Sequence, residues 1–114
     1  MHEFSIVQSL LNLIEENARK NSAKSVSKVV VKIGKMSGVE PHLLEIAFNI
    51  FKEKTIAENA DFIMEIQSVV CRCNNCNKDF TVEDYNFICP FCQSFNIEVI
   101  DGTDMILKSL ELEV

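Results

Sequence analysis

The chain has 114 residues, 47% of them hydrophobic and 25% charged, which suits one compact core and at most a small appendage stabilised by other means. Its net charge of −6 is unevenly distributed, since residues 1–60 carry 8 basic and 7 acidic side chains whereas residues 61–114 carry 3 basic and 10 acidic ones. The acidic half disfavours nucleic acid as a partner, although an acidic surface can also serve solubility alone. No apolar run reaches the roughly 18 residues of a membrane span and no export signal is evident, so we expect a cytoplasmic protein without a membrane partner.

The first predicted element is an amphipathic helix over about residues 4–20. Its apolar positions recur at steps of three and four residues, and they are Phe4, Val7, Leu11, Ile14 and Ala18. The opening residues MHE lie at or just before its first turn. Their ordinary interpretation is a polar helix start, where Glu3 interacts favourably with the helix dipole. Their chemical interpretation is a metal site, because the amine of Met1 and the amide and imidazole of His2 can form fused chelate rings in one plane, as square-planar Ni²⁺ or Cu²⁺ prefers.

A strand and a second helix are predicted next. The β-branched run VVVKI at residues 29–33 is typical of a strand. Pro41 suits the first turn of a helix that runs to about residue 55. We expect the apolar side chains of that helix to be buried, namely Leu43, Leu44, Ala47, Phe48, Ile50 and Phe51.

Two further strands complete the predicted core. Alternation of apolar and polar side chains over residues 62–67 indicates one strand, and alternation over residues 110–114 indicates the other. The apolar residues Met105 and Leu107 have the opposite parity to those after residue 109. We therefore expect a bulge or a strand change near Ser109.

The interval from Cys71 to about residue 100 has short β-like pieces, but its apolar residues have no periodicity that could form a core. It therefore needs a stabilising cross-link. Two CxxC units separated by twelve residues supply it, and their members are Cys73, Cys76, Cys89 and Cys92. Two such turns aim four thiolates at one point, which predicts a structural Zn²⁺ site of tetrahedral geometry. A closed site of this kind has no open coordination position and does no chemistry itself.

These elements predict an α/β fold. Two helices pack on a small three-stranded sheet, with an inserted four-cysteine zinc-ribbon subdomain. We assign residues 1–70 plus 101–114 to the α/β domain and residues 71–100 to the zinc-ribbon insertion.

Other uses of the cysteines have less support. A redox site would need only one CxxC pair, normally at a helix start in a thioredoxin-like context. An iron–sulfur cluster could use four cysteines, but two regular CxxC turns favour zinc. The fifth cysteine, Cys71, is either a small buried thiol or a competitor of Cys73 for the metal, and the two-residue gap favours Cys73.

The combination of these features resembles the HypA family of nickel metallochaperones, which serve the maturation of [NiFe]-hydrogenase and in some members urease. The resemblance rests on MHE at the start, VVVKIG and then GVEP in the core, and a four-cysteine ribbon inserted before a final strand. It covers essentially the whole chain, and MHE and the paired CxxC units are its most specific parts. Cys71 is the one feature that the family pattern does not require.

The resemblance implies roles for individual residues. His2 becomes the essential ligand of an exchangeable, transported Ni²⁺, with the amine of Met1 beside it. Glu3 becomes a further ligand or a contact to a partner GTPase, and Glu40 in GVEP becomes a candidate ligand. The zinc ligands become Cys73, Cys76, Cys89 and Cys92. For His42, a solvated position in the first turn of the second helix is the favoured interpretation.

The resemblance also implies partners. They are the nickel-inserting GTPase of hydrogenase maturation, the precursor of the hydrogenase large subunit and, where urease is a client, urease accessory proteins. The sequence does not set the oligomeric state, and we count a homodimer among the candidate assemblies.

Three functions therefore compete. The preferred one is a nickel carrier that is not an enzyme. The second is a zinc-ribbon adaptor or nucleic-acid-binding module in which MHE is incidental, although the ribbon half is acidic and has little interleaving of basic and aromatic residues. The third is a thiol redox enzyme, which would need a reactive CxxC of low pKa that survives without zinc. No nucleophile with a base and no phosphate-binding glycine loop is recognisable.

Overall fold

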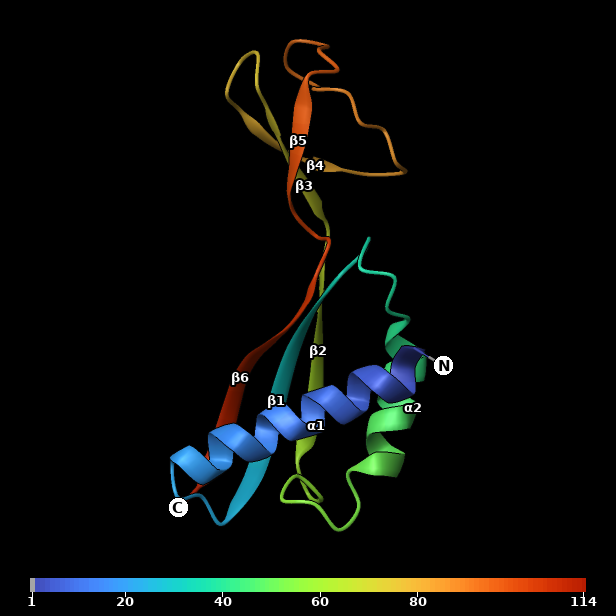
Figure 1. The fold of residues 1–114 in the computed structure, drawn as a ribbon. Coiled ribbons are helices and arrows are strands. Elements are labelled where there is room, and N and C mark those ends of the chain that lie inside the picture. Colours follow the sequence, from blue (N-terminus) through green and yellow to red (C-terminus); the bar gives the residue numbers. More distant parts are fainter. Residues whose placement is uncertain (1) are drawn as a thin grey trace.

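The computed structural model describes residues 2–114, and side chains from residue 3 onward. The chain forms two lobes joined by a narrow waist (Figure 1). The Cα radius of gyration is 17.4 Å, against about 13 Å for a compact domain of this length. The first lobe contains α1 (His2–Lys20), β1 (Ser25–Gly34), α2 (Pro41–Phe51), β2 (Asp61–Gln67) and β6 (Met105–Glu113). The second lobe contains β3 (Val69–Cys73), β4 (Asp79–Val82) and β5 (Ile97–Asp101).

The first lobe is a three-stranded sheet covered on one face by two helices, as the sequence predicts. Its strand order is β2-β1-β6, with β1 parallel to β2 and antiparallel to β6. Alternate side chains of β1 enter the core, where Val29 and Val31 are fully buried against the apolar stripe of α1 and against Leu44 and Phe48 of α2. The ring of Phe48 stacks on that of Phe62 in β2, with centroids 4.2 Å apart. None of the described helices is both long enough and apolar enough to span a membrane.

The bulge predicted near Ser109 is confirmed. Val30 of β1 pairs with Ser109, and the next residue, Val31, pairs with Leu107. Lys108 is therefore the extra residue. It reverses the parity of β6, so that the apolar side chains on both sides of the bulge point into the core.

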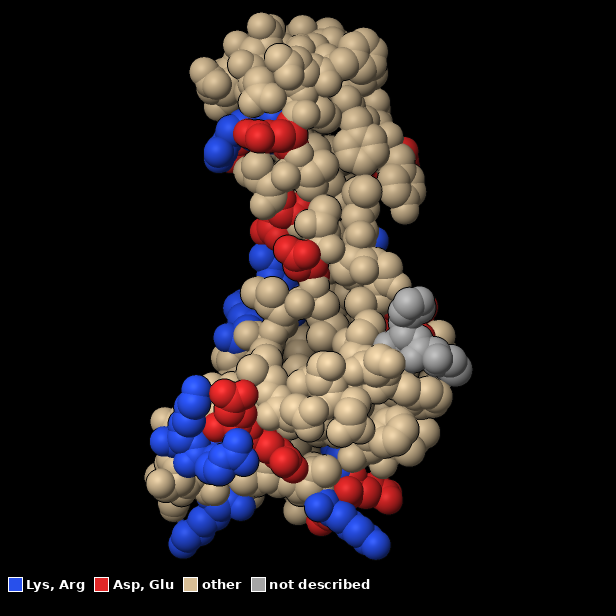
Figure 2. All heavy atoms as spheres, in the orientation of Figure 1, with Lys and Arg blue, Asp and Glu red and all other residues tan. Residues whose placement is uncertain are grey.

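Two expectations for α2 were wrong. The helix ends at Phe51 rather than near residue 55. Lys54 adopts a left-handed conformation with φ of 63°, which a right-handed helix cannot include. Leu43, Ile50 and Phe51 are 40%, 56% and 40% exposed. Leu43 and Ile50 lie on the side of α2 that meets neither α1 nor the sheet. The surface over α2 carries few charges on the face shown in Figure 2.

The second lobe is a small antiparallel sheet of order β4-β3-β5. It has a compact apolar cluster to which cysteines contribute half of the buried residues: Val69, Cys71, Cys73, Phe80, Val82 and Cys89. Cys71 is fully buried there, and desolvation raises the pKa of its thiol. It therefore has the surroundings of a small core residue.

Two crossings of the chain form the waist, β2 to β3 through Ser68 and β5 to β6 through residues 102–104. The end of β1 packs against both crossings. The N–H of Gly34 donates to the carbonyl of Asp104, and the next N–H, that of Lys35, donates to the carbonyl of Gln67, each at 2.9 Å. On the face shown in Figure 2, acidic side chains gather at the waist, and the far end of the second lobe carries none.

Candidate metal centres

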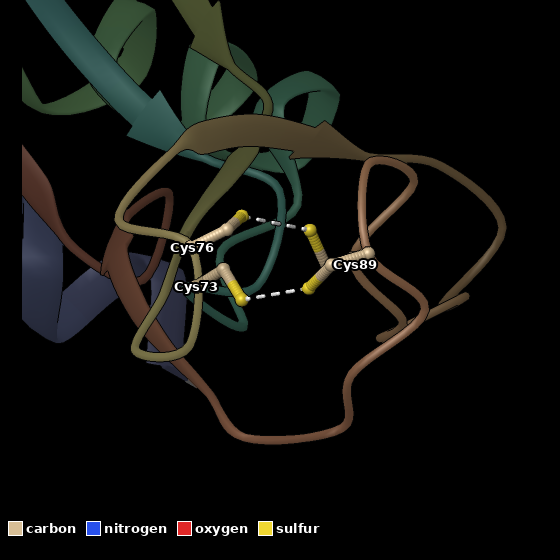
Figure 3. A group of neighbouring side chains, drawn as sticks. Cys73, Cys76 and Cys89 are labelled. Carbon is tan, nitrogen blue, oxygen red and sulfur yellow. Dashed lines mark hydrogen bonds between the residues drawn. The ribbon is translucent and has the colours of Figure 1, made fainter.

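Four cysteine thiols converge in the second lobe. Cys73 ends β3 and Cys76 lies in the turn after it, while Cys89 and Cys92 lie in a second turn before β5. Their Sγ atoms all lie within 4.8 Å of one another. The labelled thiols in Figure 3 point into a common space between the two loops. Among the described side chains, this is the one group of three or more potential metal ligands that could share an ion.

The distances between the sulfur atoms fit a tetrahedral ion. Cys73 Sγ lies 3.5 Å from Cys92 Sγ, and Cys76 Sγ lies 3.7 Å from Cys89 Sγ. Bonds of about 2.3 Å to one central Zn²⁺ would place neighbouring sulfurs about 3.8 Å apart. The same distances are far too long for disulfides. The arrangement therefore has the donor type, number and spacing of a closed four-thiolate metal site.

The two cysteine turns share one backbone pattern. The carbonyl of Cys73 accepts from the N–H of Asn77, and the carbonyl of Cys89 accepts from the N–H of Gln93, each at 2.9 Å. Asn77 and Gln93 both have positive φ, of 62° and 65°. In both turns the first cysteine's own N–H donates to the carbonyl five residues later. Two equivalent turns, facing each other, present their thiols to one point.

The surroundings of the thiols favour charge at one of them. A hydrogen bond from the side-chain amide of Asn75, 3.6 Å from Cys92 Sγ, and one from the backbone at Ser94 lower the pKa of Cys92 to about 6. At Cys76 a backbone hydrogen bond at Lys78 lowers the pKa, but burial and the neighbouring thiols outweigh it and raise the value to about 11. Cys92 therefore becomes a thiolate, the form that binds a metal ion, more readily than Cys76.

Sequence reasoning missed Asn75. Its backbone N–H lies 3.4 Å from Cys73 Sγ, and its side chain reaches the other turn at Cys92. It therefore holds the two halves of the site in register. The available signal was its place as the second residue between the cysteines of CNNC, where the backbone N–H can turn back onto the first thiolate.

The amino-terminal candidates lie on α1 and α2 of the first lobe. Met1 lies outside the described residues, and of His2 the structure describes the backbone, which begins α1. Glu3 lies in the first turn of α1 and is only 9% exposed, which makes it the one buried charged side chain among those described. The first turn of α1 packs against α2, where the ring of Phe4 meets that of Phe51 edge-on at 5.2 Å.

The other two candidates belong to the start of α2. Glu40 is exposed and caps the helix, because its Oε2 accepts from the N–H of Leu43 at 3.0 Å. His42 is exposed in the first turn, as expected for a solvated helix residue. Among the described side chains no hydrogen bond joins Glu3 to Glu40, and the four cysteines are the only predicted ligands that the structure gathers around a point.

Comparisons with known proteins agree with one another. Residues 1–112 match the family described as HypA, hydrogenase/urease nickel incorporation metallochaperone. The hydrogenase maturation factor HypA of Aquifex aeolicus is 63% identical over 114 residues, which cover 100% of this chain and 99% of the relative. The corresponding factor of Wolinella succinogenes is 43% identical and is matched over 99% of this chain and 96% of its own.

A solved structure shares the fold as well. The solution structure of the Ni metallochaperone HypA from Helicobacter pylori has a TM-score of 0.72 and 34% sequence identity. The match covers 97% of each chain. The likeness therefore includes both lobes.

Proposed function

Since the chain belongs to the HypA family of nickel-incorporating metallochaperones of hydrogenase maturation, which are not enzymes, we propose that it binds Ni²⁺ through its amino-terminal Met-His-Glu motif. The amine of Met1 and the amide and imidazole of His2 supply three nitrogen donors. Glu3 and Glu40 are the candidate oxygen donors. The observation that supports this proposal is the place of Glu3, which directly follows the histidine in the first turn of α1 and is only 9% exposed.

The four-cysteine site has a separate, structural role in this proposal. Cys73, Cys76, Cys89 and Cys92 hold Zn²⁺, whose preference for thiolate and for tetrahedral geometry matches the spacing of the sulfur atoms. The bound ion cross-links and so stabilises a lobe whose own apolar cluster is small. We propose the corresponding division into a nickel-binding domain, residues 1–70 with 101–114, and a zinc-ribbon insertion, residues 71–100.

The cargo is delivered in the cytoplasm. The partners in this proposal are the nickel-inserting GTPase and the precursor of the hydrogenase large subunit, together with urease accessory proteins where urease is a client. The proposal also includes self-association of the chain into a homodimer. A terminal site with few protein donors exchanges its ligands easily, and imidazole is lost as a ligand when it becomes protonated. Nickel affinity therefore falls as the pH drops below about 6.5, the unperturbed pKa of histidine.

Calorimetric titration of Ni²⁺ into zinc-loaded protein with its native amino terminus tests the proposal. His2→Ala, and separately an added residue before Met1, should each abolish one stoichiometric nickel site and its dependence on pH. His42→Ala is the matched control, because it removes the only other histidine, an exposed one, and should leave the site intact. Zinc content should be the same in all four proteins. Equal nickel binding by all four would make MHE only a helix start and favour a zinc-ribbon adaptor.

A further inference from the structure

The four thiols of the second lobe make two hydrogen-bonded contacts, and each contact joins one cysteine turn to the other. Cys73 Sγ lies 3.5 Å from Cys92 Sγ, and Cys76 Sγ lies 3.7 Å from Cys89 Sγ. Figure 3 shows the second contact with both of its residues labelled. Since the S–S bond of a disulfide is about 2.05 Å long, the sulfur atoms of each pair need to approach by only about 1.5 Å. A shift of that size is within the reach of side-chain torsions.

Each pair combines an accessible thiol with a buried one. Cys73 and Cys89 are fully buried, whereas Cys76 and Cys92 are partly exposed. An oxidant that arrives from solvent therefore meets an exposed thiol first, with the buried thiol of the same pair directly beside it. An accessible thiol next to a second thiol that can react with its oxidised form is the arrangement of cysteines that form reversible disulfides.

Asn75 holds one of the two pairs together. Its backbone N–H lies 3.4 Å from Cys73 Sγ, and its side-chain amide lies 3.6 Å from Cys92 Sγ. The amide thus crosses from the first turn to the second and keeps the thiol of the second turn beside the buried thiol of the first. A contact that spans the turns favours a disulfide between the turns over a disulfide within one turn.

We propose that the four-cysteine site is also a reversible oxidation site for a hydroperoxide such as H₂O₂. Its two disulfides join the turns crosswise, Cys73 to Cys92 and Cys76 to Cys89, and Asn75 positions the first pair. The release of zinc in this inference rests on the structural zinc site of the proposed function, whereas the pairing of the thiols does not. Neither of them depends on the nickel site.

The formation of each disulfide consumes one hydroperoxide. The accessible thiolate attacks the O–O bond and becomes a sulfenic acid, and the other oxygen leaves as water after it takes up a proton. The buried thiolate then attacks the sulfenic sulfur, the S–O bond breaks, and the departing hydroxide also takes up a proton. The two thiolates lose the two electrons that reduce the O–O bond. Because thiolates are the metal-binding form of cysteine, a site with two disulfides releases its ion.

The crosswise pairing decides what happens to the lobe. Two disulfides between the turns replace the link that the ion supplies, whereas a disulfide within each turn would leave the turns unjoined. The apolar cluster of the lobe is small, and cysteines contribute half of its buried residues, so the link between the turns is needed to hold the fold. Far-UV circular dichroism should therefore be the same before and after oxidation, and a loss of strand signal would contradict crosswise pairing.

Treatment of the zinc-loaded full chain with hydrogen peroxide tests the inference. Zinc per chain is measured first. A chain without zinc would refute the zinc site alone, because its disulfides can still be mapped. Peroxide should then release one zinc ion for every two H₂O₂ consumed, as measured with a coloured chelator, and a reductant with added Zn²⁺ should restore the metal. Zinc that peroxide does not release, or a loss that the reductant does not reverse, would overturn the inference.

Peptide mapping tests the pairing. After the remaining thiols are alkylated in denaturant, trypsin cuts at Lys78 between the two turns and at no position within either turn. Crosswise disulfides should release the peptides of the two turns as one linked species, and its fragmentation should join Cys73 to Cys92. Cys71 should be alkylated in full. Separate peptides with a disulfide inside each turn, or a linkage of Cys73 to Cys89, would overturn the proposal.

Two neighbouring asparagines provide a matched pair of variants. Asn75→Ala removes the amide that lies between the turns and should lower the ratio of the Cys73–Cys92 disulfide to all other pairings about fivefold, the effect of one lost hydrogen bond. Asn74→Ala removes another contact between the two loops, that of its Nδ2 with Asn96 Oδ1 at 3.3 Å, and should leave the ratio unchanged. Equal ratios in the two variants would overturn the role of Asn75.

Discussion

Cys71 and Cys73 are both fully buried and lie two residues apart in β3, yet their surroundings differ. Cys73 Sγ lies 3.5 Å from another thiol of the four-cysteine site, whereas Cys71 lies outside that group, with its pKa raised by burial. We expect Cys73→Ala to lose the zinc ion, because three thiolates leave the tetrahedral shell open. Cys71→Ala should keep one zinc per chain and lose only a little stability to a small cavity. Metal analysis of both purified variants checks this, and zinc loss from Cys71→Ala would contradict it.

The spacing of the cysteines predicted which four thiols share a metal site, but it did not predict which of these thiols has a lowered pKa. The two-residue gaps distinguish Cys73 from Cys71 without any structure. The low pKa of Cys92 depends on the amide of Asn75, which reaches it from the other turn. The two residues lie 17 positions apart in the chain, so no local sequence pattern shows that contact.

At the scale of elements, α2 shows how a helix that is apolar nearly all round can still be half exposed. Leu44, Ala47 and Phe48 are buried, while Leu43, Ile46 and Ile50 form a stripe on the outer side. Periodicity predicted that a helix follows Pro41. It did not predict how much of the helix surface would be covered, because a 3.6-residue repeat defines a side of the helix only when the other side is polar.

The difference between the two sides of α2 should appear in the free energy of unfolding. Phe48→Ala removes a fully buried ring that stacks on Phe62 and should cost about 3–5 kcal/mol. Ile50→Ala in the same helix removes a side chain that is mostly exposed and should change stability by no more than about 0.5 kcal/mol. Urea unfolding of the zinc-loaded proteins, followed by circular dichroism, measures both. Equal losses would mean that the outer stripe is covered in solution.

At the scale of the whole molecule, the two lobes are held at the waist by backbone contact. A Cβ at Gly34 would lie 2.3 Å from the carbonyl carbon and oxygen of Gly102 and 2.9 Å from the amide nitrogen of Thr103. A side-chain ion pair adds to this contact, since Lys32 Nζ lies 2.9 Å from Asp101 Oδ2. The lysine holds the pKa of that carboxyl below its usual value. The junction therefore sets the direction in which the second lobe projects.

Gly34→Ala should disturb this junction. Backbone atoms cannot move aside as a flexible side chain can, so we expect the lobes to reorient and the melting temperature to fall. Small-angle scattering should show a changed radius of gyration. Gly38→Ala is the control, because no atom lies within 4 Å of its added Cβ and only its φ of +79° is unfavourable, at a cost of about 1–2 kcal/mol. Identical scattering curves for Gly34→Ala and the unchanged protein would rule out a close contact at the waist.

By itself the sequence determined what depends on neighbours along the chain. The helix over about residues 4–20, the bulge near Ser109 and the two cysteine turns all follow from spacing, because periodicity and turn chemistry act over a few residues. Tertiary structure decided what depends on residues far apart in the chain. It set which side of α2 is buried and how Gly34 meets Gly102 to separate two lobes. The physical reason is that burial and close backbone contact depend on the surface that another element presents, and no local pattern specifies that surface.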